Sequence, residues 1–235
     1  MNTKTKNVYI KFIVAIIIFC ACGSLRAQRL VSIKNTCGLY YRTIHDLEKQ
    51  QRPVLKFYQF RPHDTIASIG AQACNWEAAY AAVSDSTFFY LEDIDTTYCN
   101  FQQASMAWQY YGQLKGDKMT SDFAVIMGDE KSTHLAQHSC DKILIINSFH
   151  EFTYPAEMLK DIAGKLKPAG TLYIDETLAS YTGELHVACN KRMYTETELI
   201  QFVEKNGFIY KNSITLAYYK RKPGRKIFAF TRKNG

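Results

Sequence analysis

A histidine with an adjacent carboxylate follows the most apolar of the expected strands. Residues 142–146 read KILII, and His150 and Glu151 follow after three further residues. The usual pKa of an imidazole lies near neutrality, so His150 is the natural candidate for a general base, and Glu151 can orient its ring. A histidine that only packs or caps the end of a buried strand is the alternative.

A glycine turn and an acidic residue form a second pattern with chemical meaning. Gly70 follows the short apolar run 65–69, and Asp93 lies 23 positions later, at the end of a second β-rich run. Such a turn lets a nucleoside ligand approach backbone amides, and the carboxylate can accept hydrogen bonds from both ribose hydroxyls. A plain strand-to-helix turn and a solvated acidic loop are the alternatives.

Two further residues with ligating side chains lie near the last helical segment. His186 and Cys189 are three positions apart. Two ligands do not make a metal site, so no metal is expected from this pair.

Short β-rich runs alternate with helical patterns along most of the chain, and together they must position these residues. The pattern predicts five strands in succession, at residues 65–69, 87–91, 123–127, 142–146 and 171–174. Helices are expected at residues 39–60, 75–83, 100–114, 155–166 and 195–206, the last with Thr195 as N-cap, Glu198 three residues on and Gly207 ending it.

Two closing strands, 208–219 and 226–231, are joined by the turn Lys222-Pro223-Gly224-Arg225. A second turn, Lys167-Pro168-Ala169-Gly170, is expected to separate the fourth helix from the fifth strand. Alternation of strands and helices implies a parallel sheet covered on both faces. The predicted fold is α/β, a doubly wound, Rossmann-like, mostly parallel seven-stranded sheet with a C-terminal antiparallel hairpin.

The order of these motifs resembles the class I S-adenosylmethionine-dependent methyltransferases. The resemblance covers about residues 62–232 and is carried by the glycine turn, the acidic end of strand two, Gly128-Asp129-Glu130 after strand three, and the segment Leu166-Lys167-Pro168-Ala169-Gly170. It implies S-adenosylmethionine as cofactor and methyl transfer as the reaction. The loop after Gly70 departs from the family, because Ala73 and Cys74 replace residues that are usually glycine and narrow the space near the cofactor.

The resemblance also implies roles for individual residues. Gly70, Ala71 and Gln72 would line the methionine and ribose portion of the cofactor, Asp93 would hold the ribose hydroxyls, and Asp129 would bind the adenine amino group. Glu130 belongs to the same cofactor-binding set. Asn147 and Ser148 would lie with His150 at the tip of strand four, where that family presents the methyl group, so that the expected catalytic set is His150, Asn147 and Glu151.

The N-terminus is typical of an export signal. Lys4, Lys6 and Lys11 precede an apolar run from Phe12 to Cys22, and small residues follow. The run is shorter than the roughly 20 residues of a spanning helix. The expected organisation is a signal peptide at 1–27, a helical extension at 28–61 and a methyltransferase-like domain at 62–235. The protein is then periplasmic or extracellular, with an uncleaved membrane anchor as the alternative.

Charge and cysteine content narrow the classes of partner. The net charge is +7, but thirteen of the 29 basic residues lie in segments 1–34 and 220–235, which contain no acid, leaving 16 bases against 22 acids. Nucleic acid is therefore an improbable partner, and a membrane is expected only at the N-terminal segment. Five cysteines remain after residue 27; an odd number without CxxC spacing predicts mostly buried thiols.

Two hypotheses about function follow, because fold does not fix activity. The leading hypothesis is methyl transfer to a small-molecule or protein acceptor that the sequence does not name. The alternative is an exported, non-catalytic binding protein on the same fold, since S-adenosylmethionine is polar and does not cross a bilayer unaided. A nicotinamide-dependent oxidoreductase is disfavoured because the full GxGxxG fingerprint is missing.

Overall fold

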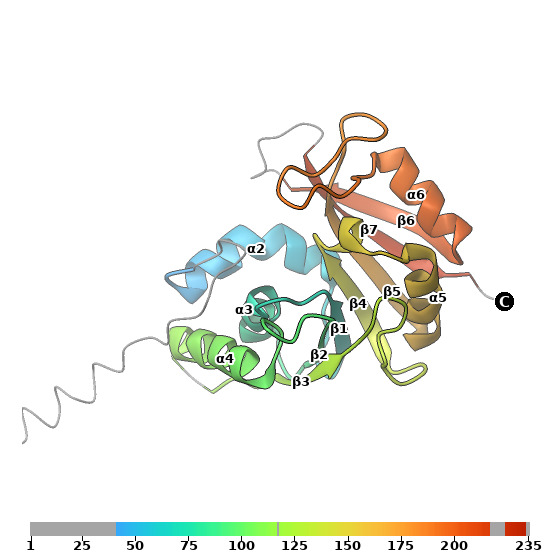
Figure 1. Cartoon of the computed structure of the whole chain (residues 1–235). Helices are drawn as coiled ribbons and strands as arrows, with labels where there is room; N and C mark the ends of the chain where they lie inside the picture. Colours follow the sequence, from blue (N-terminus) through green and yellow to red (C-terminus); the bar gives the residue numbers. More distant parts are fainter. Residues whose placement is uncertain (1–40, 117, 217–223, 234–235) are drawn as a thin grey trace, which may run out of the picture. The chain divides into compact units, whose positions relative to one another are not determined.

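The fold is a seven-stranded sheet with helices on both faces. The computed structural model describes residues 41–116, 118–216 and 224–233 (Figure 1). The strand order is β3-β2-β1-β4-β5-β7-β6. The predicted fold class is therefore confirmed. The strands are β1 (Thr65–Ile69), β2 (Phe88–Asp93), β3 (Asp122–Met127), β4 (Cys140–Ile146), β5 (Leu166–Thr177), β6 (Phe208–Thr215) and β7 (Arg225–Arg232).

The central strands β1 and β4 are buried along nearly their whole length. Ile66, Ala67, Ile143, Leu144 and Ile145 are all inaccessible to solvent. Neither strand alternates between apolar and polar residues, because helices cover both faces of a parallel sheet. The two strands pair in parallel with each other, and β1 also pairs in parallel with β2.

Within residues 41–216, five helices cover the sheet. On one face lie α2 (Ile44–Tyr58), α3 (Asn75–Val83) and α4 (Phe101–Lys115), and on the other lie α5 (Pro155–Lys165) and α6 (Glu196–Lys205) (Figure 1). A 3-10 turn, η1, follows β4 at Phe149–Glu151. None of the helices in the described part of the chain is long and apolar enough to span a membrane. The expected signal segment, 1–27, and the first part of the helical extension lie outside the described residues.

The C-terminal end of the domain confirms two local predictions. Helix α6 begins with a capping box, in which Thr195 accepts from the Glu198 amide and the Glu198 carboxylate accepts from the Thr195 amide. Strand β7 pairs antiparallel with both β5 and β6. The strand expected at 208–219 is described as far as Thr215, and most of the predicted turn at 222–225 lies outside the described residues.

One predicted boundary is wrong. Residues 167–170 were expected to form a turn before the fifth strand, but β5 already begins at Leu166. Leu166 pairs with Cys140 and Thr171 pairs with Lys142, so the intervening residues form an irregularity within the strand. The extra residues bulge out of the ladder, which lets Pro168 lie within the strand although it donates no hydrogen bond.

A buried ion pair joins β5 to the hairpin. Nε and Nη2 of Arg225 donate to the two carboxylate oxygens of Asp175, at 2.6 Å and 3.0 Å. The side chains are 6% and 3% exposed. A planar guanidinium matches both carboxylate oxygens at once, which makes this the strong form of ion pair.

We expect Asp175→Ala to lower the free energy of unfolding by about 3–5 kcal/mol, because it leaves the guanidinium buried without its counter-charge. Urea unfolding followed by circular dichroism measures this. The control is Lys226→Ala, which breaks the neighbouring, more exposed pair with Glu196 and should cost less than about 1 kcal/mol. Equal losses in the two variants would contradict the assignment.

Candidate functional site

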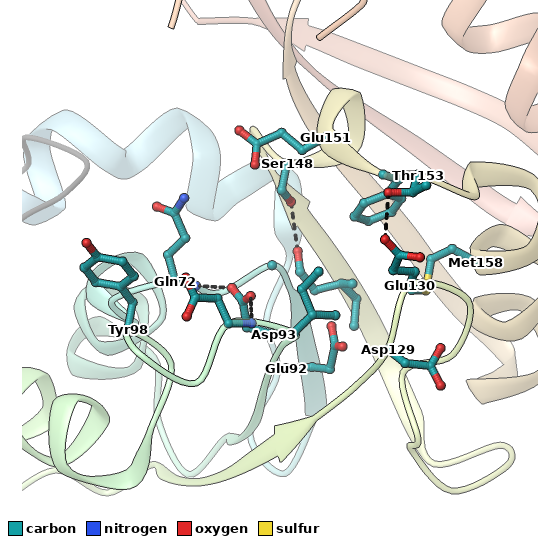
Figure 2. A pocket seen from close by; sticks show the side chains of 15 residues that line it. Gln72, Glu92, Asp93, Tyr98, Asp129, Glu130, Ser148, Glu151, Thr153 and Met158 are labelled. Atoms are coloured by element: carbon teal, nitrogen blue, oxygen red, sulfur yellow. Dashed lines mark hydrogen bonds between the residues drawn. The ribbon is translucent and has the colours of Figure 1, made fainter. Parts of the chain in front are cut away.

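A cavity of about 300 Å³ lies at the carboxyl ends of β1, β2, β3 and β4. This edge of an open α/β sheet is where such folds bind ligands. Figure 2 shows the side chains around it. The lining residues are Ile69, Gly70, Gln72, Glu92, Asp93, Ile94, Asp95, Tyr98, Asp129, Glu130, Ser148, Glu151, Phe152, Thr153 and Met158.

Gly70 forms the floor of the cavity and has no room for a side chain. Its φ is +75°, and a Cβ placed there would lie 2.7 Å from Oγ of Ser148. That hydroxyl donates to the carbonyl of Ile69 at 2.9 Å, which fixes the loop after β4 against the end of β1. The amides of Gly70 and Ala71 both donate to the carbonyl of Glu92. Glycine is therefore required by both backbone conformation and space.

The loop after Gly70 keeps a glycine-like backbone without glycine. Gln72 and Cys74 adopt φ of 45° and 58°, the left-handed region that L-residues rarely occupy. Ala73 and Cys74, expected to narrow the cofactor space, are buried and do not line the cavity. Ala71 is also buried and does not line it. The departure from a glycine-rich loop thus changes the backbone energy of the loop more than the space for a ligand.

Asp93 ties the glycine loop to the end of β2. Its two carboxylate oxygens accept from the amides of Gln72 and Asp95, each at 2.8 Å (Figure 2). A carboxylate offers about four acceptor positions, so each oxygen keeps capacity for another donor. Asp93 lies on the cavity wall and is held rigidly in place, as a group that binds two adjacent hydroxyls must be.

The cavity is strongly acidic, since none of its fifteen lining residues is basic. The side chain of Glu92 is buried, and its Oε1 has no hydrogen-bond partner among the described residues. Burial, reinforced by the negative charge of Asp93, raises the pKa of Glu92 to about 8. Six carboxyl groups line the cavity: Glu92, Asp93, Asp95, Asp129, Glu130 and Glu151.

The segment after β3 places the predicted adenine-binding residues at the cavity rim. Gly128 leaves the space that the Glu92 carboxyl occupies, so a Cβ there would collide with it. The Asp129 carboxylate is exposed, accepts from the Lys131 and Ser132 amides, and lies 3.0 Å from Nε2 of His134. Figure 2 shows it directed away from Asp93. The amide of Lys131 holds the pKa of Asp129 below its usual value.

Glu130 lies closer to the far wall of the cavity. Its Oε1 accepts from the hydroxyl of Thr153 at 3.2 Å, which connects the segment after β3 to the one after η1 (Figure 2). Of the six residues expected to bind the cofactor, five line the cavity, and Ala71 is the exception.

The three residues expected to be catalytic separate at the tip of β4. Glu151 lines the cavity, whereas Asn147 and His150 do not. Asn147 adopts a φ of 54°, and its Oδ1 accepts from the hydroxyl of Thr177 at 2.9 Å. This hydrogen bond connects the end of β4 to β5. Of the three residues, only Glu151 faces the ligand space.

His150 is oriented by Glu176, a residue that the sequence did not indicate. Its Nδ1 lies 2.9 Å from Oε1 of Glu176, while the expected partner, Glu151, lies 3.7 Å from Nε2. Burial favours the neutral ring, but the hydrogen bond and charge of Glu176 outweigh it and raise the pKa of His150. Glu176 lies on β5, the neighbour of β4, and no local spacing in the sequence indicates this contact.

Several apolar cavity residues were also missed. Ile94 and Tyr98 are large side chains that remain 56% and 40% exposed beside Asp93. The sequence feature that could have identified Ile94 as a cavity residue is its position between two aspartates at the end of a strand. An apolar side chain at that position has no core to enter. Phe152 and Met158 line the opposite wall.

Three of the cysteines confirm the prediction of buried thiols. Cys74, Cys99 and Cys140 are buried and free, and Cys189 is partly exposed. The sulfur atoms of Cys74 and Cys99 lie 3.8 Å apart. Cys37 lies outside the described residues.

Comparison with known proteins agrees with this fold. Residues 81–174 match the family model described as a methyltransferase domain. A SAM-dependent methyltransferase from Aquifex aeolicus is 19% identical, with a TM-score of 0.58, over 80% of this chain and 96% of its own. One from Methanosarcina mazei is 14% identical, with a TM-score of 0.60, over 78% and 98%.

The cyclase SpnF has the same fold, with a TM-score of 0.60 and 14% identity over 89% of both chains. No match is found among curated proteins. The fold is the α/β Rossmann-like fold of these methyltransferases, and residues 81–174 carry the similarity to a methyltransferase domain.

We expect Gly70→Ala to lower the free energy of unfolding by about 1–3 kcal/mol more than Gly116→Ala. Both glycines have a φ of +75°, but a Cβ at Gly116 meets nothing within 4 Å. The pair therefore separates steric collision with Ser148 from backbone strain alone. Urea unfolding of the two variants measures the difference, and equal costs would show that Ser148 moves aside freely.

We expect the stability of the protein to fall with rising pH through Glu92. Its pKa is about 8 when folded, against 4.5 as the ordinary value, so between these pH values the folded chain holds a proton that the unfolded chain has lost. The contribution is complete below pH 4.5 and disappears toward pH 8, at up to about 1.4 kcal/mol per pH unit.

Glu92→Gln removes this dependence, so its stability advantage over the parent protein should grow between pH 5 and 8. Urea unfolding across this range measures it. Glu157→Gln, at an exposed position on α5, is the control and should give a constant difference. A constant difference for Glu92→Gln as well would show that Glu92 ionises normally.

Proposed function

We propose that this protein binds S-adenosylmethionine in the acidic cavity and transfers its methyl group to an acceptor. The observation that carries the proposal is the rigid Asp93 carboxylate in a cavity whose lining contains six carboxyl groups and no basic residue. S-adenosylmethionine combines a ribose diol with a cationic sulfonium and an ammonium group. The ribose diol can donate hydrogen bonds to Asp93. The sulfonium and ammonium charges are attracted by the negative charge of the cavity.

The residues present fit this cofactor in type and in space. Asp93 keeps free acceptor positions for the ribose hydroxyls, and Ile94 and Tyr98 offer apolar surface beside it for a flat base. The buried Oε1 of Glu92, which has no partner among the described residues, adds a polar group at the cavity wall. The volume of about 300 Å³ lies at the lower end of the range for small-molecule sites.

The bound cofactor would supply an electrophilic methyl group, and the chain would supply alignment. Methyl transfer from a sulfonium is an in-line displacement that depends on the relative position of donor and acceptor. Asp93 and the loop after Gly70 would hold the nucleoside. Where the acceptor must lose a proton, Glu151 is the predicted catalytic residue that lines the cavity, whereas His150 does not.

The same charge argues against the oxidoreductase alternative. Nicotinamide dinucleotides contain a pyrophosphate, which requires cations or free backbone amides. None of the lining residues is basic, and the Gln72 amide is already bonded to Asp93. A pyrophosphate would be repelled by the carboxylates around it.

A non-catalytic binding protein on this fold is the second candidate. The observation that favours it is the loop after Gly70, which keeps Gln72 and Cys74 in left-handed conformations that glycine would adopt without strain. Export would also separate the protein from the cytosolic cofactor, and export stays a prediction here. The acceptor, small molecule or protein, is likewise an open part of the proposal, and nucleic acid is not expected.

We expect Asp93→Ala to weaken binding of S-adenosylmethionine about 10- to 100-fold, as the loss of charge-assisted hydrogen bonds to ribose requires. Calorimetric titration with S-adenosylmethionine and S-adenosylhomocysteine measures it. Asp85→Ala, at an exposed position before the amino end of β2, is the control and should bind normally.

Asp93→Asn serves as a second variant, since it retains an acceptor for the Gln72 amide if the alanine variant unfolds. Unchanged affinity in a folded Asp93 variant would overturn the ribose assignment. Absence of binding by the parent protein would overturn the proposed cofactor. Binding without transfer to any acceptor tested would favour the non-catalytic candidate.

A further inference from the structure

One side of the His150 ring is buried without a hydrogen-bond partner. The side chain is 1% exposed, and Nδ1 is occupied by Glu176. Nε2 is buried and finds no hydrogen-bond partner in the described part of the chain. A carboxylate oxygen of Glu151 lies 3.7 Å away. A buried imidazole nitrogen without a partner costs free energy, so its position calls for a ligand.

Two other ligating side chains lie near the His150 ring. His186 and Cys189 each place one atom so that, together with a nitrogen of His150, all three lie within 4.8 Å of one another. The imidazole rings of His150 and His186 have centroids 4.7 Å apart. Sγ of Cys189 lies 3.2 Å from Nδ1 of His186. The fold therefore adds a third residue to the pair that the sequence analysis judged insufficient for a metal.

A small antiparallel loop fixes the positions of His186 and Cys189. Leu185 and Arg192 form an antiparallel bridge at its base. The amide of His186 donates to the carbonyl of Lys191, and the amide of Asn190 donates to the carbonyl of His186, each at 2.8 Å. The two side chains are thus presented from a closed turn of the backbone.

From this cluster we infer a site for a zinc-type divalent transition metal, bound by Nε2 of His150, an imidazole nitrogen of His186 and the thiolate of Cys189. Two imidazoles and a thiolate are ligands that Zn²⁺ prefers. In a tetrahedral zinc site, ligand atoms lie about 3.3–3.6 Å apart, given metal–ligand distances of about 2.0–2.3 Å. The observed separations are within reach of that geometry by small side-chain rotations.

Glu176 completes the arrangement as a positioning residue. A metal-bound histidine commonly donates its other ring N–H to a carboxylate, which fixes the tautomer and ring orientation. The contact between Nδ1 of His150 and Glu176, 2.9 Å long, is of this kind and leaves Nε2 for the metal. Three protein ligands would leave a fourth position for water or a substrate atom. Glu151, which lines the cavity, lies 3.7 Å from Nε2 of His150.

The test is titration of the full-length, chelator-treated protein with Co²⁺ and Zn²⁺. We expect one Co²⁺ per chain to bind with a thiolate-to-cobalt charge-transfer absorption, to be displaced by Zn²⁺, and to raise the thermal midpoint of unfolding. Cys189→Ala should lose the charge-transfer band, and His186→Ala should weaken metal affinity at least 10-fold. Glu176→Gln should keep the band and weaken affinity about 10- to 100-fold.

His45→Ala is the matched control, since His45 is an exposed histidine on α2 that should not affect binding. Circular dichroism establishes that each variant is folded; His186 and Cys189 lie in a partly exposed loop, so their variants keep the test valid if Glu176→Gln unfolds. Absence of the band in the parent protein, its persistence in Cys189→Ala, or equal weakening by His45→Ala would overturn the assignment.

Discussion

Parallel pairing of β1 with both β2 and β4 is the constraint on which the site depends. Parallel strands end at the same edge of a sheet, so the segments that leave β1, β2 and β4 must converge there. Burial of β1 and β4 on both faces leaves only their ends for polar chemistry. Gly70, Asp93 and Ser148 each follow or end one of these strands, and hydrogen bonds between the segments hold them in register (Figure 2).

Acidic residues at the ends of neighbouring strands lie close together and repel one another. The fold reduces this repulsion in two ways. Asp93 stays at the cavity wall because two backbone amides donate to its carboxylate. Glu92, one residue earlier, points into the interior beside Gly128, and burial with the charge of Asp93 raises its pKa to about 8. Backbone amides thus hold the first carboxyl in place, whereas the second is favoured as the neutral acid. A cationic ligand in the cavity would relieve the remaining repulsion.

The sequence was sufficient for those features that depend on nearby residues. Hydrophobic patterns located β1 and α3 to the residue, and the capping box at Thr195 marked the start of α6. The spacing of Gly70 and Asp93 placed both on the cavity because a helix and a strand separate them in any such fold. Contacts that depend on strand register could not be predicted from the sequence. Glu176 contacts His150 only because β5 pairs with β4. The bulge at 167–170 could not be predicted for the same reason. Residues typical of a turn became part of β5 because that strand pairs with β4.

His150 has two candidate roles, as a general base for the cavity and as a ligand of the proposed metal site. A general base in the cavity would need a free ring nitrogen facing the ligand, but Nδ1 contacts Glu176, Nε2 is buried, and the ring does not line the cavity. An imidazole that binds a metal through Nε2 has no lone pair left for proton transfer. The base and ligand roles of His150 therefore exclude each other. Glu151 lines the cavity and lies 3.7 Å from Nε2 of His150, so it is the carboxylate shared by the cavity and the proposed metal site.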